Sequence, residues 1–169
     1  MKVRNQKKLV SIIAAHMVDF SPDTKAVRGL VFRPWGGSKH KYGRHCAGLL
    51  EVFTPAIAWR MVRHGANPAK DVDHLGREVL FAIAHEFRHS QQILDGWDGA
   101  TVLDAAKDDQ TAYLTDPGEA DANAFATMVV IQEEPKFIRH LGRYAQWVCR
   151  HQWAEFKAAA TDHTKQKGE

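Results

Sequence analysis

The stretch that decides the fold is REVLFAIAHEFRHSQQ, which runs from Arg77 to Gln92. Leu80, Ile83 and Phe87 recur within it at helical spacing, so they predict an apolar stripe along one side of an amphipathic helix. The helical pattern extends from Leu75 to Leu94 and is the most regular segment of the chain. We therefore expect a long helix here, with one face buried against the rest of the fold.

The same helix carries the pattern HExxH, formed by His85, Glu86 and His89. Two histidines at this spacing project from one side of a helix, one turn apart, and both imidazoles can bind a single metal ion. The glutamate beside the first histidine is then placed to accept a proton from metal-activated water, as in zinc hydrolases. The pattern predicts His85 and His89 as ligands of one Zn²⁺ per chain, and Glu86 as the catalytic base.

A catalytic zinc site needs a third protein ligand, and the best candidate is Glu119 on a predicted helix over Pro117–Ile131. Helical geometry puts Glu119 on the flank of the buried stripe of that helix, whereas Asp121 points to the other flank. Asp121 and Asp116 stay open as alternative ligands. In a competing interpretation, Asp116 and Glu119 form a capping box, and Glu119 only caps the helix.

The apolar run into HExxH, followed downstream by EADANAFA over Glu119–Ala126, resembles the ImmA/IrrE-type metallopeptidases, a gluzincin-like branch of the zincin superfamily. The resemblance implies that zinc is bound by the two histidines of HExxH and by the glutamate that opens the second pattern. These ligands fall on His85, His89 and Glu119, and the family's catalytic glutamate falls on Glu86.

The resemblance covers roughly Cys46 to Ile131 and departs from the family in two places. Arg88 stands where the family usually has glycine, and Thr127–Val130 replaces a usual Leu-Leu-x-Pro. The resemblance also implies an edge strand beside the active-site helix that pairs with an extended peptide. Cys46–Phe53 is the expected strand.

The remaining pattern predicts an α+β fold with early strands and a mostly helical C-terminal half. The resemblance implies that this fold is zincin-like, with the small sheet packed on the active-site helix. We expect strands at Ala26–Trp35 and Cys46–Phe53, separated by a cationic loop over Lys39–Arg44. Residues 1–160 form one domain and residues 161–169 a polar tail. The other expected helices are Asn5–Val18, Pro55–Val62, Val102–Ala106 and Pro135 to about Ala160.

Composition narrows the possible classes of function. The 169-residue chain has a formal net charge of +3, which gives little support to direct contact with nucleic acid. The absence of a long apolar run argues against a membrane segment. Cys46 and Cys149 belong to no CxxC pattern and are expected to be reduced thiols of a cytoplasmic protein. The apolar residues Leu9–Ala15 fit an amphipathic helix better than a signal peptide.

Other residues are candidates for supporting roles. Asn123, one turn after Glu119, is expected to orient a metal ligand. A donor that stabilises an oxyanion is also needed, and the candidates are Tyr113, His140 and Arg143.

These features predict a zinc metallopeptidase that hydrolyses a protein or peptide substrate by metal-activated water with a glutamate general base. The alternative is a catalytically silent zincin-like binding or regulatory module of phage or mobile-element origin. A third possibility is a nucleic-acid-associated protease of the SprT-like kind.

Overall fold

The computed structural model describes residues 8–13, 15, 27–37, 41–46, 48–97 and 115–166. Residues 8–13 are helical. The strands of this part are β1 (Gly29–Phe32), β2 (Gly43–Cys46) and β3 (Leu49–Val52), and the longer helices are α2 (Thr54–Arg63), α3 (Val72–Leu94), α6 (Pro117–Gln132) and α7 (Pro135–Gln166). The expected helix Val102–Ala106 and the candidate Tyr113 lie outside the described residues.

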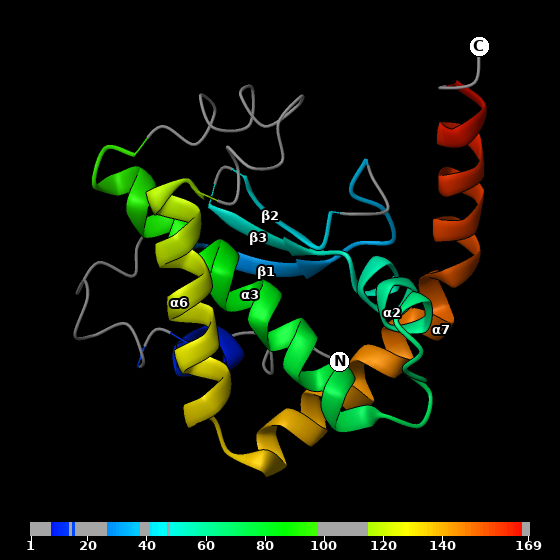
Figure 1. Cartoon of the computed structure of the whole chain (residues 1–169), viewed down its shortest axis with the longest axis horizontal. Coiled ribbons are helices and arrows are strands. Elements are labelled where there is room, and N and C mark those ends of the chain that lie inside the picture. Colours follow the sequence, from blue (N-terminus) through cyan, green and yellow to red (C-terminus); the bar gives the residue numbers. More distant parts are fainter. Residues whose placement is uncertain are drawn as a thin grey trace.

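The three strands form one mixed sheet with the order β1-β3-β2. β1 runs parallel to β3, and β2 runs antiparallel to it. Leu30, Phe32, Leu50 and Val52 are buried in the same cluster as the apolar face of α3, so one face of the sheet packs on this helix. Figure 1 shows the sheet lying along α3, with α6 on the other side. The predicted α+β class is confirmed.

The sheet differs from the prediction in its strand positions. Instead of one strand over Cys46–Phe53, the chain forms two, and Gly48, at a φ of 81°, lies between them. β2 begins at Gly43, inside the segment expected to be a cationic loop. The central strand is therefore β3, and β1 and β2 are the two edge strands of the described sheet, so the expected edge strand was wrong in position.

The helices largely follow the predicted boundaries. α3 starts at Val72, with Asp71 at the N-cap position, and Gly96 follows its end at a φ of 92°. α7 continues past Ala160 to Gln166, so residues 161–166, expected in the polar tail, are helical. None of the helices in the described part combines the length and apolar character of a membrane-spanning segment.

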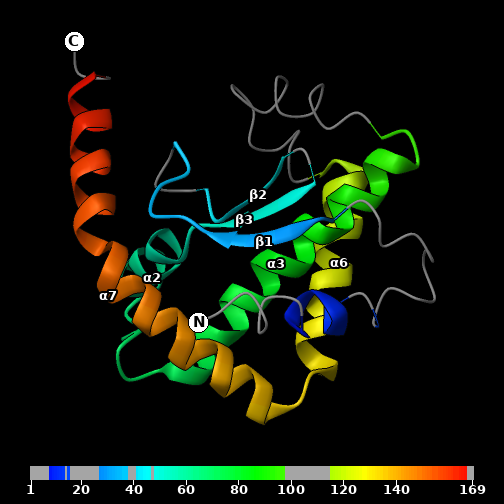
Figure 2. The same cartoon turned by 180° about the vertical axis from the view of Figure 1, so that it is seen from behind.

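α3 is the centre of the fold. Leu75, Val79, Leu80, Ile83 and Phe87 have no exposed surface, because the sheet, α6 and α7 surround the helix. In Figures 1 and 2, α6 runs beside α3, and α7 crosses its N-terminal end before extending past the sheet. The HExxH segment thus lies on the most enclosed element of the structure.

Two glycines allow α3 and α7 to cross with their backbones in contact. A Cβ at Gly76 would lie 2.1 Å from the carbonyl oxygen of Ile138, and a Cβ at Gly142 would lie 1.9 Å from that of Val72. Backbone atoms cannot move aside as the end of a side chain can. The crossing therefore requires glycine at both positions.

The Gly142→Ala variant tests this crossing. Alanine favours a helix more than glycine does, yet overpacking against Val72 should lower the free energy of unfolding by about 1–3 kcal/mol. Chemical denaturation measures this change. The neighbouring exposed residue gives the control, since Arg143→Ala should change stability by less than about 0.5 kcal/mol. A Gly142→Ala protein as stable as the wild type would contradict the close crossing.

The face of the sheet opposite α3 carries a buried carboxylate, that of Glu51, between two arginines. Arg33 Nε donates to Glu51 Oε1 at 3.0 Å, and Arg44 Nε donates to Oε2 at 2.7 Å. Burial alone would raise the pKa of Glu51, but the hydrogen bonds and charges of Arg44 and Arg33 outweigh it and lower the pKa below 4.5. The ionised form of Glu51 is thus the one that the sheet stabilises.

Because the folded-state pKa of Glu51 is depressed, its stabilising effect is complete above its ordinary pKa and is lost as the pH falls through the folded value. Glu51→Gln should therefore lower the unfolding free energy by about 1–2 kcal/mol at pH 7. The difference in unfolding free energy between this variant and the wild type should narrow below pH 4.5. Denaturation curves at several pH values check this, with Glu78→Gln as the control. A gap that stays constant with pH would count against the ion pairs.

Candidate metal centre

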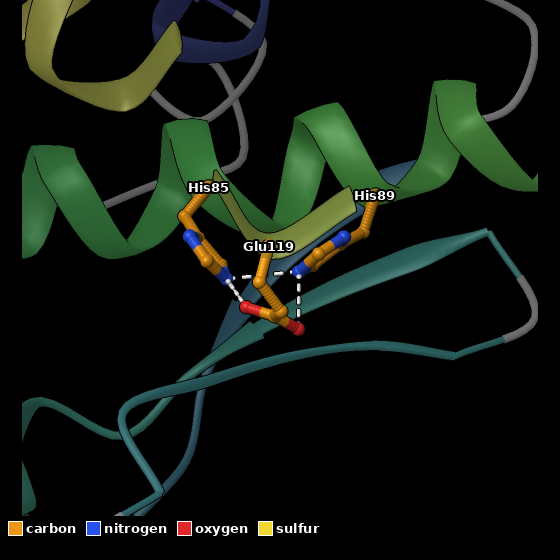
Figure 3. Close-up of side chains that lie close together, drawn as sticks. All are labelled: His85, His89 and Glu119. Carbon is orange, nitrogen blue, oxygen red and sulfur yellow. Dashed lines mark hydrogen bonds and ion pairs between the residues drawn. The ribbon is translucent and has the colours of Figure 1, made fainter. Parts of the chain in front are cut away.

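Three side chains from two helices converge in the structure. His85 and His89 come from α3 and Glu119 from the first turn of α6, as Figure 3 shows. Glu119 Oε2 lies 3.2 Å from His85 Nε2, and Oε1 lies 3.2 Å from His89 Nε2. One ligand atom from each residue fits within 4.8 Å of the other two. The predicted trio is therefore assembled.

Local interactions aim the Glu119 carboxylate at the histidines. Asp116 caps α6 by accepting the Glu119 backbone N–H at 3.0 Å, which fixes the first turn of the helix. A Cβ at Gly118 would come within 2.5 Å of the Trp97 indole, and that indole stacks on His89 with 4.8 Å between ring centroids. Asp116 caps the helix as expected, but the Glu119 side chain faces the histidines instead of completing a capping box.

Gln92 determines which ring nitrogen of His89 carries the proton. Its amide nitrogen donates to the carbonyl of Gly118 and to Asp121, both at 2.8 Å, so its oxygen must be the atom 2.7 Å from His89 Nδ1. His89 Nδ1 is then the donor, and its Nε2 faces the centre as the atom that can bind a metal. This role of Gln92 was not predicted from the sequence, although Gln92 follows His89 at a spacing that places both on one helix face.

Asn123 holds His85 in the same way. Its side-chain oxygen lies 3.1 Å from His85 Nδ1, so an Nδ1–H can donate to it and turn Nε2 toward Glu119. The predicted contact between Asn123 and a candidate ligand is present in the structure.

The arrangement of acceptors fits a cation. His85 Nε2 and His89 Nε2 are only 2.9 Å apart, and each also faces a carboxylate oxygen of Glu119. With both Nδ1 atoms committed as donors, these nitrogens would present lone pairs to one another, which requires a proton or a metal ion between them. Burial opposes protonation of His89, but the hydrogen bonds that its ring donates to Glu119 and Gln92 prevail and raise its pKa. Two imidazoles and one carboxylate are a donor set typical of catalytic zinc.

The side chain of Glu86 projects from α3 toward the edge strand β2. A Cβ at Gly43 would be 2.6 Å from Glu86 Cγ, so the strand can approach this closely only because residue 43 has no side chain. The backbone N–H of His45 donates to the Glu86 carboxylate. Burial raises the pKa of Glu86 above its usual value, against the attraction of His85 and His89. The role of Gly43 could not be predicted from the sequence, because it depends on how β2 meets α3.

Asp121, an alternative third ligand, has other partners. Arg88 Nε donates to Asp121 Oδ2 at 2.6 Å, and Gln92 donates to the same oxygen. Burial would raise the pKa of Asp121, but the hydrogen bonds from Arg88 and Gln92 lower it. Asp121 thus anchors Gln92 and ties α6 to α3, and Glu119 is the carboxylate at the centre.

Two candidates for oxyanion stabilisation lie elsewhere. Arg143 lines a cavity of about 680 Å³ with Lys70 and Asp73 at the start of α3. Asp73 precedes His85 by about 18 Å along the helix axis, at 1.5 Å per residue. His140 lines a second cavity with Leu9, near the same end of the molecule. Both candidates are therefore wrong as parts of this centre.

Comparisons of the chain with protein-family models, with curated proteins and with solved structures gave no match. The chemistry of this centre is therefore argued from its own residues.

Gln92→Leu tests whether the second ring nitrogen of His89 must be held. Loss of this contact should weaken zinc binding by about 10–100-fold. Competition with a chromophoric chelator measures the affinity, and Glu119→Ala should abolish stoichiometric zinc. Gln91→Leu is the matched control, because the buried Gln91 amide has no hydrogen-bond partner among the described residues. Equal zinc affinity in the wild type and in both leucine variants would rule out a positioning role for Gln92.

Proposed function

We propose that this protein is a zinc-dependent metallopeptidase that hydrolyses peptide bonds of a protein substrate. The observation that carries the proposal is the convergence of His85, His89 and Glu119, with Glu86 adjacent on the same helix as the first two. A purely structural zinc site has no use for a half-buried glutamate beside its ligands. That glutamate favours a catalytic centre over a binding module.

The proposed centre contains candidate zinc ligands and residues that orient them. His85, His89 and Glu119 would hold the zinc ion, while Asn123 and Gln92 fix the two rings. When bound, zinc supplies a Lewis acid that acidifies water and polarises the scissile carbonyl.

Glu86 is the group that moves the proton in this proposal. Its carboxylate accepts a proton from the attacking water and delivers it to the nitrogen of the leaving amine. Burial shifts the pKa of Glu86 upward, in the direction of neutral pH. A carboxyl group whose pKa lies nearer the working pH can both accept and release a proton efficiently.

The zincin-like architecture and the ImmA/IrrE-type relationship belong to this proposal. They are supported by a sheet that packs on the HExxH helix and by a glutamate on the following described helix.

A cytoplasmic location is proposed with them. Its support is that Cys46 and Cys149 are free thiols, and that burial raises the pKa of Cys149 to about 12, which keeps it protonated.

Glu86→Gln tests the catalytic role. The zinc-loaded variant should keep one zinc per chain by elemental mass spectrometry but lose at least about 100-fold in peptide cleavage. Cleavage is followed by mass spectrometry on a library of peptides made by chymotrypsin digestion of a whole proteome. The control, Glu78→Gln on the same helix, should cleave as the wild type does.

Undiminished cleavage by the Glu86→Gln protein would refute the mechanism. Zinc binding without cleavage of any peptide by the wild type would instead favour the catalytically silent binding or regulatory module.

A further inference from the structure

The edge of β2 has a defined hydrogen-bonding pattern. Phe53 N donates to Tyr42 O at 2.9 Å across the antiparallel pair. Alternate residues of such a strand face the partner, so Arg44 turns its backbone groups toward β3, and Gly43 and His45 turn theirs away from it. Among the described strands, β3 is the only one that pairs with β2.

This edge runs directly over the proposed base. Gly43 is in contact with Glu86 Cγ, and the N–H of His45 reaches the Glu86 carboxylate. Figure 3 shows the strands of the sheet passing beside the three candidate ligands. The N–H of His45 is thus engaged by Glu86, so an extended chain laid along β2 would pair with the other backbone groups of this edge and would pass beside the group proposed to activate water.

The sheet face opposite α3 carries charged side chains that would lie next to such a chain. Arg44 pairs with Glu51 across the sheet, and Arg33 shares the same carboxylate. The side chains of Arg33 and Arg44 are 50% and 45% exposed, whereas that of Glu51 is 7% exposed. One buried negative charge thus holds two exposed guanidinium groups side by side, with a net charge of +1.

Strand geometry relates these arginines to the added chain. In an added chain that runs antiparallel to β2, the residue opposite Arg44 would form a non-hydrogen-bonded pair with it, the arrangement in which Cα atoms approach to about 4.5 Å and side chains are closest. Its side chain would lie on the outer face, next to Arg44. The residues before and after it would point inward, toward α3 and the metal centre.

We infer that the substrate is an extended protein segment with an aspartate or glutamate within two residues of the cleaved bond, recognised by Arg44 with Arg33. This inference rests on the proposed peptidase function. Opposite charges across a strand pair are favourable, and like charges are not. Phosphates of a nucleic acid would also meet these arginines, but they lack the alternating donors and acceptors that pair with the β2 edge.

The test maps cleavage sites of the zinc-loaded protein in the chymotryptic peptide library, which retains internal acidic and basic residues. The wild type should enrich Asp and Glu at one position near the cleaved bond by about two- to fivefold, the range expected for one cross-strand charge pair. Arg44→Glu should shift enrichment at that position to Lys and Arg. Arg44→Gln, which leaves Glu51 paired with Arg33, should only remove the preference. Arg143→Glu, the same charge change on α7, should leave it intact.

The outcomes separate this inference from the proposed function. Cleavage by the wild type without acidic enrichment, or with an enrichment that the Arg44 variants retain, overturns the inference but not the proposed peptidase function.

If no peptide is cleaved, the proposed peptidase function is wrong, and a binding measurement then tests the inference. Zinc-loaded Glu86→Gln should then bind an acidic fluorescent peptide more tightly than its Asp-to-Lys counterpart, and equal binding overturns it. A preference for single-stranded DNA over both peptides, lost in Arg44→Gln, also overturns it.

Discussion

The approach of two imidazole nitrogens to 2.9 Å, with one carboxylate facing both, is the constraint on which the rest of the structure depends. Acceptors do not gather in a largely buried place unless a positive charge joins them. Here the side chains of His85 and Glu119 are only 13% and 5% exposed. The junction of α3 and α6 therefore has to be positioned closely, and a ring of neutral and charged hydrogen bonds around the centre does this.

The parts predicted from sequence are those specified by local periodicity. The HExxH helix and the α6 helix follow from apolar residues at helical spacing, and the angle around α6 separates Glu119 from Asp121. β2 could not be predicted this way. Gly43–Cys46 reads Gly-Arg-His-Cys, which has neither the β-branched residues nor the alternation of a strand. It is a strand because Gly48 turns the chain so that β3 supplies its hydrogen bonds.

The hydrogen bonds around the ligands were also beyond sequence reasoning, because they link residues whose relative placement depends on how two helices meet. Arg88 illustrates this. It stands where the family that the sequence resembles usually has glycine. In the structure it pairs with Asp121, which also accepts a hydrogen bond from Gln92. A bulky cation on one helix is thus matched by an acid on the other, and the pair supports the residue that orients His89.

Gly43 lets the sheet approach the candidate metal centre closely. The inner face of the sheet is committed to the core through Leu50 and Val52, and the outer face carries Glu51 and its arginines. The edge of β2 lies close to Glu86, and this approach is possible because residue 43 lacks a side chain. A side chain there would force the strand and the carboxylate apart, so that one extended chain could no longer reach both. The absence of a single Cβ therefore decides whether the fold can bring a strand edge and the proposed general base to the same extended chain.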